Sequence, residues 1–211
     1  MKAMLVRGLG LALMLSFAAH AQSLPRPKEF YFDQDEATTG PVVAIEGSDE
    51  PTHARLMQMI ERGQRDADRA AAQLAHAAMR TGRTETGIAL YQRALDDAAQ
   101  RSALRKAIHW NYGWDLLRSG DAEAALEQWL AAVSGRLAGP EWLPPTLAMV
   151  LWRLERHDEA RDWYAAAVRT YPQRWRDPGD FSALLPGWQD DERATLAEVH
   201  AAWRENPPAW P

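Results

Sequence analysis

The sequence predicts an all-α fold, a right-handed superhelix of antiparallel helix pairs with a capping helix at each end. Apolar residues recur with helical spacing from Thr52 to about Asn206, and no stretch of useful length alternates apolar and polar residues as a strand would. Within this region the aromatic residues Tyr91, Trp129 and Tyr164 stand 38 and 35 residues apart in similar surroundings. A period of this length is typical of stacked helical repeats.

The N-terminal segment, residues 1–21, has the pattern of a secretory signal peptide. Lys2 and Arg7 precede an apolar run from Leu9 to Ala19, and the segment closes with AHA, which has small residues at its first and third positions. Its apolar run is well short of the roughly 20 residues that span a bilayer. We therefore expect cleavage before Gln22, a periplasmic location, and no membrane span in the mature chain.

The composition excludes several classes of function. The chain carries 24 basic and 29 acidic residues, and removal of Lys2 and Arg7 leaves 22 basic residues against 29 acidic ones. This negative balance disfavours nucleic acid and anionic membranes as partners. Because the chain has no cysteine, it has no disulfide, no thiol nucleophile, no lipid-attachment cysteine and no c-type haem motif.

Two segments precede the repeats. Residues 22–51 are rich in Pro, Gly, Asp and Glu without helical period, which predicts an extended or disordered leader. Residues 52–67 place Leu56, Met59 and Ile60 on one stripe, which predicts a helix stacked on the first repeat.

The repeats themselves span residues 68–174 as three units, 68–101, 106–139 and 141–174. Each unit has a small residue four positions before its aromatic residue and an alanine three positions after it, and two of the three have a glycine nine positions before it. The corresponding residues are Gly87, Ala125 and Ala160; Ala94, Ala132 and Ala167; and Gly82, Gly120 and the exception Glu155. Small residues let two helices cross closely, and the glycine lets the chain reverse between them.

These columns resemble the tetratricopeptide repeat family, whose unit is a helix-turn-helix of about 34 residues. Pro172 matches the proline that the family has near the end of the second helix. The chain departs from the family pattern where Ala71, His109 and Pro144 replace the usual large aromatic residue early in the first helix. The resemblance implies a stacked superhelix whose concave face, formed by the first helices, holds a peptide or a partner helix.

Residues 175–211 predict a connector followed by a C-terminal capping helix. The connector is broken by proline and glycine, and the acids Asp190 and Glu192 then open a stretch with Leu196, Val199 and Trp203 on one face. A solenoid needs such a cap to cover its last apolar face.

A second face of the first helices combines tryptophan with arginine. Arginine stands eleven residues before the aromatic residue of every unit, and both residue types are enriched at interface hot spots. The candidate binding residues on this face are Arg80, Trp110, Trp114, Arg118, Trp142, Met149, Trp152 and Arg153. In the competing interpretation these tryptophans are buried under the flanking helices or the leader and only pack.

The resulting hypothesis is a non-enzymatic exported adaptor that binds a protein or peptide partner in a cell-envelope complex. Its arginines predict a partner segment that offers carboxylates and an apolar anchor. Two alternatives remain open: a ligand- or carbohydrate-binding module that uses the indoles as stacking platforms, and a non-catalytic subunit of an enzyme complex. We find no catalytic motif and no metal-ligand spacing and expect no cofactor. The oligomeric state is left open.

Overall fold

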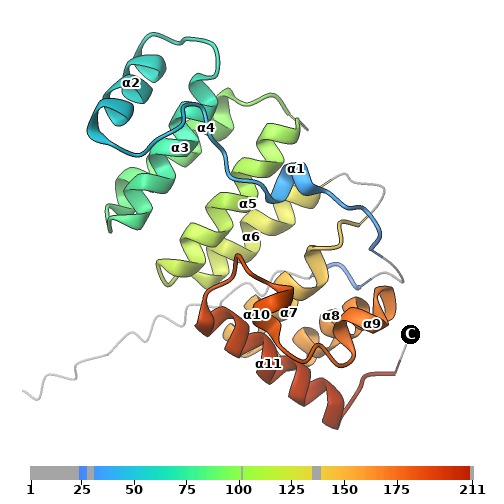
Figure 1. The fold of residues 1–211 in the computed structure, drawn as a ribbon. Coiled ribbons are helices and arrows are strands. Elements are labelled where there is room, and N and C mark those ends of the chain that lie inside the picture. Colours follow the sequence, from blue (N-terminus) through green and yellow to red (C-terminus); the bar gives the residue numbers. More distant parts are fainter. Residues whose placement is uncertain (1–23, 28–30, 101, 135–138, 210–211) are drawn as a thin grey trace, which may run out of the picture.

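The computed structural model describes residues 24–27, 31–100, 102–134 and 139–209, so the predicted signal peptide lies outside the described residues. Apart from one isolated bridge between Asp33 and Pro140, the described residues form helices and irregular connections only. The prediction of an all-α fold is confirmed (Figure 1).

Three helix pairs form the body of the molecule. The pairs are α3 (Ala67–Arg80) with α4 (Thr84–Asp97), α5 (Ala103–Arg118) with α6 (Ala122–Val133), and α7 (Leu143–Arg153) with α8 (His157–Thr170). The two helices of each pair pack on each other, and each pair also packs on the next, through α3 and α4 on α5 and through α6 on α7. Stacking covers the apolar face that a single pair would leave exposed.

The turn inside each pair has the same geometry, including the one unit that lacks a glycine. Gly82 and Gly120 have φ of 75° and 97°, and Glu155 has φ of 57° at the equivalent position. In each turn this residue donates its N–H to the carbonyl three residues back, and the next residue donates to the carbonyl five residues before it. This is the Schellman arrangement that ends a helix. Glu155 therefore adopts the left-handed conformation that glycine tolerates best.

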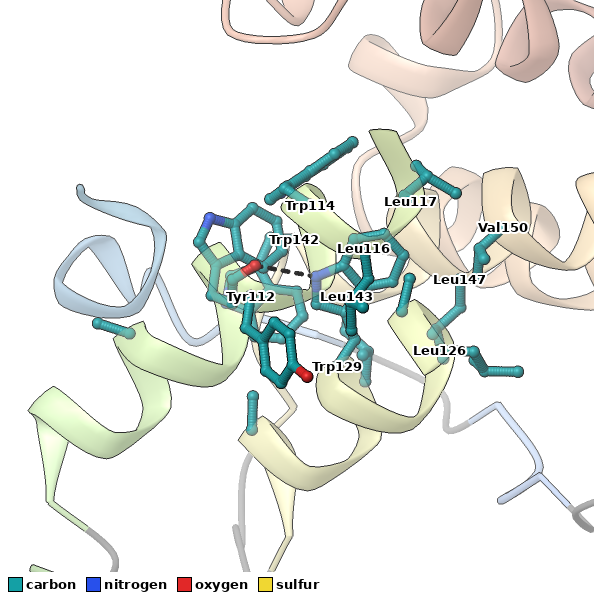
Figure 2. Close-up of a cluster of buried hydrophobic side chains, with 14 of the residues drawn as sticks. Tyr112, Trp114, Leu116, Leu117, Leu126, Trp129, Trp142, Leu143, Leu147 and Val150 are labelled. Carbon is teal, nitrogen blue, oxygen red and sulfur yellow. Dashed lines mark hydrogen bonds between the residues drawn. The ribbon is translucent and has the colours of Figure 1, made fainter. Parts of the chain in front are cut away.

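The aromatic residues of the repeat are fully buried, as the spacing predicts. Tyr91, Trp129 and Tyr164 all have 0 % exposure. The indole Nε1 of Trp129 donates to the carbonyl of Trp110 at 3.3 Å, a bond that is drawn in Figure 2. A Cβ built on Gly113 would lie 2.5 Å from that nitrogen. The absence of a side chain at Gly113 thus lets α5 approach α6 closely enough to enclose the indole.

Gly113→Ala should destabilise the protein although it places a better helix former in α5. Overpacking costs about 1–3 kcal/mol, which exceeds the gain in helix propensity of about 1 kcal/mol. Urea denaturation measures the difference. Gly187→Ala is the matched control, because a Cβ at Gly187 has no atom within 4 Å. A Gly113→Ala protein as stable as wild type would contradict the close approach.

Shorter and flanking helices complete the fold. They are α1 (Glu36–Thr39) and α2 (Glu50–Glu61) before the pairs, and α9 (Pro172–Trp175), α10 (Phe181–Leu184) and α11 (Asp190–Glu205) after them. The interpretation of residues 52–67 as one helix is wrong at its C-terminal end. The helix ends at Glu61, and Gly63 and Asp66 both have positive φ in the connection to α3. α11 packs on α7 and α8 and buries Leu196 and Val199.

The described part of the leader is irregular apart from α1 and the first residues of α2, and it is packed on the pairs. Tyr31 is 2 % exposed and lies against Gly139, where a Cβ would come within 2.3 Å of its ring. Asp33 exchanges backbone hydrogen bonds with Gly139 and Glu141. α1 packs on α5, and the leader then crosses toward α3 and α2 (Figure 1). The side formed by the first helices of the pairs is therefore partly covered.

Candidate functional site

A cavity of about 470 Å³ lies where α5 and α7 meet the leader and the connector that follows α9. Five tryptophans from four parts of the chain line it, and we call it the tryptophan pocket. They are Trp110 and Trp114 of α5, Trp142 at the start of α7, Trp175 of α9, and Trp188 in the connector before α11. The pocket is partly open to solvent, and its size falls in the range of small-molecule sites.

The indoles stand at steep angles to one another. The ring centroids of Trp110 and Trp114 are 5.6 Å apart with planes at 81°, and those of Trp114 and Trp188 are 5.0 Å apart at 66°. Trp110 and Trp142 follow at 4.5 Å and 59°. Figure 2 shows Trp114 and Trp142 in the buried cluster beside Trp129. The rings therefore form adjoining walls, not one flat platform.

One side of the pocket carries a buried carboxylate with two protein partners. Asp115 is 4 % exposed, its Oδ2 accepts a hydrogen bond from the Tyr91 hydroxyl at 2.6 Å, and His76 Nδ1 lies 2.9 Å from the same oxygen. Burial, and then the neighbouring Asp115 charge, raise the pKa of Tyr91 well above its usual value. The hydroxyl therefore remains protonated and holds Asp115 in place.

Two residues that line the pocket each have a buried polar atom with no partner among the described residues. These atoms are Oε2 of Glu141 and Nε1 of Trp142. The other carboxylate oxygen of Glu141 forms an ion pair with Arg174 Nη1 at 3.5 Å, which is at the long limit of a hydrogen bond. Both atoms have almost no solvent-accessible surface, so they are one buried acceptor and one buried donor left unsatisfied beside the pocket.

The structure places the predicted binding residues differently from the sequence expectation. The expectation of exposed indoles is wrong, because Trp110, Trp114 and Trp142 are 7–8 % exposed and Met149 is 0 % exposed. Trp152 is partly exposed, and its Nε1 donates to Glu198 of α11 at 2.9 Å. The competing interpretation, burial under the flanking segments, therefore describes these tryptophans better.

Two of the three repeated arginines already have carboxylate partners inside the chain. Arg118 binds Glu192 of α11 through Nε and Nη2, at 2.8 and 3.2 Å, and its guanidinium lies 5.0 Å from the ring centroid of Trp114. Arg153 pairs with Asp191 at 2.7 Å. Each of these two arginines therefore already has, from α11, a carboxylate of the kind that the sequence analysis expected from a partner. Only Arg80 of the three is exposed without an ion pair in the described part of the chain.

The leader lies on α3 and α5 through contacts to its backbone. Gln73 Oε1 accepts from the N–H of Ala44 at 2.8 Å and of Ile45 at 3.1 Å, and its Nε2 donates to the carbonyl of Ile45 at 2.7 Å. Asn111 Nδ2 donates to the carbonyl of Gly40 at 2.9 Å. Two side-chain amides thus hold this part of the leader through its main chain, with no contact to its side chains in these hydrogen bonds.

Sequence reasoning identified Trp110, Trp114 and Trp142 but missed the other walls of the pocket. Trp175 and Trp188 fall in a region that the sequence predicts only as a connector and a capping helix, and no motif marks Glu141. The one available signal was the density of tryptophan in and after the third unit. Gln73 and Asn111 carry no sequence signal of their function, since single amides are common on helix surfaces.

The described residues hold no group of three or more His, Cys, Asp or Glu side chains arranged for a metal ion. Over the same residues, no helix combines the length and the apolar character needed to cross a membrane.

Comparison with known proteins agrees with the repeat architecture. A family model described as tetratricopeptide repeat matches residues 72–138 and 147–174. The first match covers the α3/α4 and α5/α6 pairs, and the second covers α7/α8. The searches of curated proteins and of solved structures give no match.

Proposed function

Because the chain belongs to the tetratricopeptide repeat family, we propose that it is a non-catalytic adaptor of the cell envelope that holds an extended segment of a protein partner against α3 and α5. Repeats of this family form protein-interaction scaffolds, and solenoids present long surfaces of this kind to their partners.

The hydrogen bonds from Gln73 and Asn111 to the leader are the observation that supports this function. They engage main-chain carbonyl and N–H groups at Gly40 and at a bend that contains Ala44 and Ile45, and every peptide has such groups. Main-chain hydrogen bonds give affinity without strict sequence preference. The same two amides can therefore hold a partner segment in place of the leader.

A partner segment can reach this surface either by displacing the leader or by binding beside it. Arg80, at the end of α3, lies at a polar cavity shared with His76 and the connector. Arg80 is exposed and has no ion pair among the described residues, so its guanidinium is available to an acidic group of the partner. Arg118 and Arg153, in contrast, are paired with carboxylates of α11.

Site-specific crosslinking tests the proposal on the full chain. A photoreactive benzoylphenylalanine at Arg80 should yield a discrete crosslinked protein in cells, whereas the same residue at exposed Gln92 of α4 should yield none. Gln73→Ala combined with Asn111→Ala should change the yield at position 80, because the leader and the partner compete for the same amides. Equal yields from positions 80 and 92 would contradict binding at α3 and α5.

The identity of the crosslinked protein also separates the adaptor from the alternative of an enzyme subunit. A partner with catalytic activity would make this chain the non-catalytic subunit of an enzyme complex, whereas a structural or secretory partner would make it a scaffold.

The envelope location rests on the N-terminal pattern of Lys2 and Arg7, an apolar run and the AHA motif. We expect protein isolated from the envelope fraction to begin at or near Gln22. Edman sequencing or N-terminal peptide mapping checks this, and a chain that begins at Met1 in that fraction would overturn the proposal of cleavage.

A further inference from the structure

We propose that residues 40–48 form a strap that lifts from α3 and α5 while α1 and α2 stay docked, and that the partner segment binds in its place. This inference rests on the proposed binding of a partner at α3 and α5, and it names the step that admits the partner. The strap is the part of the leader that joins α1 to α2 (Figure 1).

The chain on either side of the strap is firmly packed. Before it, Tyr31 is buried against Gly139, and α1 packs on α5 with Thr38 fully buried. After it, α2 packs on α3 and buries Leu56 and Ile60. Both ends of the strap are therefore tied to the helix pairs by side chains whose release would expose apolar area to water.

The strap itself has few such contacts. Val42 is its only buried side chain, and its other residues are half-buried or exposed. Residues 41–47 form no backbone-to-backbone hydrogen bond with any described residue, and the bonds that hold their main chain come from the Gln73 amide. Segments with few buried apolar contacts open locally at a lower free energy than the helices around them.

A partly open cavity of about 170 Å³ lies between the strap and α3. Residues 41–43 line it from the strap, and Ala72 and Ala77 line it from α3. His76 and Asn111 border both this cavity and the tryptophan pocket. Lifting the strap would therefore join the two spaces into one groove along α3 and α5.

The groove selects a partner segment by its main chain and by one aliphatic side chain. The amides of Gln73 and Asn111 bind main-chain groups of the strap and can bind those of a partner that bends in the same way. Val42 lines the cavity above Ala72 and leaves part of it unfilled. A segment with a leucine or isoleucine at this place would keep the main-chain bonds and bury more apolar area than Val42 does.

A strap that has to lift lowers the apparent affinity of the partner. The apparent dissociation constant rises in inverse proportion to the fraction of molecules that are open. A substitution that loosens the strap and leaves Gln73 and Asn111 unchanged should therefore strengthen partner binding, whereas a covalent lock should abolish it.

Hydrogen exchange of the full chain, followed by mass spectrometry, tests whether the strap opens alone. Val42→Ala removes two buried methyl groups, so exchange at the Ala44 and Ile45 amides should become about tenfold faster. Segments 31–39 and 50–61 should exchange as in the wild type. Glu46→Ala is the matched control and should change neither, because Glu46 is an exposed residue of the same strap. Unchanged exchange at the two amides in Val42→Ala, or equal acceleration in the flanking segments, would overturn the strap.

A covalent lock tests whether the partner takes the place of the strap. Val43 and Ala77 line the same cavity, and because the chain has no cysteine, a short bis-maleimide joins only the two sites of a Val43→Cys, Ala77→Cys protein. The control is the same protein blocked with N-ethylmaleimide, and thermal melts show that both are folded. In envelope extract, the locked protein with benzoylphenylalanine at position 80 should lose the crosslinked partner that the blocked protein gives.

The outcomes separate this inference from the proposed function. Equal crosslinking of the locked and the blocked protein would overturn displacement of the strap and leave partner binding intact. Absence of the product from the blocked protein, together with local opening in Val42→Ala, would contradict the proposed function and support the strap as a movable segment.

Discussion

Trp129→Ala is expected to lower the free energy of unfolding by about 3–5 kcal/mol. The indole is 0 % exposed, lies between α5 and α6 against Gly113, and has ring neighbours in Trp110 at 6.2 Å and Trp114 at 5.1 Å. Its removal leaves a cavity that the surrounding helices can fill only in part. It also removes the hydrogen bond to the carbonyl of Trp110.

Urea denaturation followed by circular dichroism measures this loss. Trp152→Ala serves as the control, because Trp152 is partly exposed and its Nε1 bonds to Glu198 in an exposed position. A much smaller loss is expected there. If the two variants unfolded at the same urea concentration, Trp129 would not have the central packing role that its burial indicates.

Glu192→Ala is the second substitution with a large expected effect, about 3 kcal/mol or more. The carboxylate is 1 % exposed, binds Arg118 through two hydrogen bonds, and accepts a third from the backbone N–H of Gln189 at 2.7 Å. The substitution removes the capping box of α11 and leaves Arg118 without its partner. Because Arg118 is 30 % exposed and keeps some hydration, we place the effect at the low end of the range for buried pairs.

Asp191→Ala is the matched control for Glu192. Asp191 also pairs α11 with an arginine of the repeats, but its side chain is 65 % exposed, and exposed pairs contribute about 0–1 kcal/mol. Thermal and urea unfolding of the two variants should therefore differ clearly. Similar losses from both would contradict the distinction between a buried and an exposed attachment of α11.

The repeats could be predicted because their determinants are local in sequence. The small residues, the turn position and the buried aromatic residue of one unit lie within a few helical turns, and three copies reinforce the pattern. Glu155 departs from the glycine pattern of the turns, but it fits the same turn because it takes the same left-handed conformation as Gly82 and Gly120.

The covering of the first helices could not be predicted from these patterns. Whether Trp114 is exposed depends on the connector residue Trp188, and whether Arg118 is free depends on Glu192, which lies 74 residues further along the chain. An amphipathic pattern shows that a helix has a second face, but not which distant segment covers it. Similarly, the composition of residues 22–51 indicates a lack of helix and does not reveal the amides at Gln73 and Asn111 that bind the leader.

The attachment of the leader imposes an order on the folding of the chain. Contacts within helix pairs join residues close in sequence and can form early, whereas contacts between distant residues require closure of a long loop and form slowly. The leader is synthesised before the repeats, yet Asp33 bonds to Gly139 and Glu141, at the entry to the third unit. These contacts cannot form until the chain has been made as far as Glu141, beyond the first two helix pairs. The first segment of the described chain to be translated is therefore among the last to reach its native place.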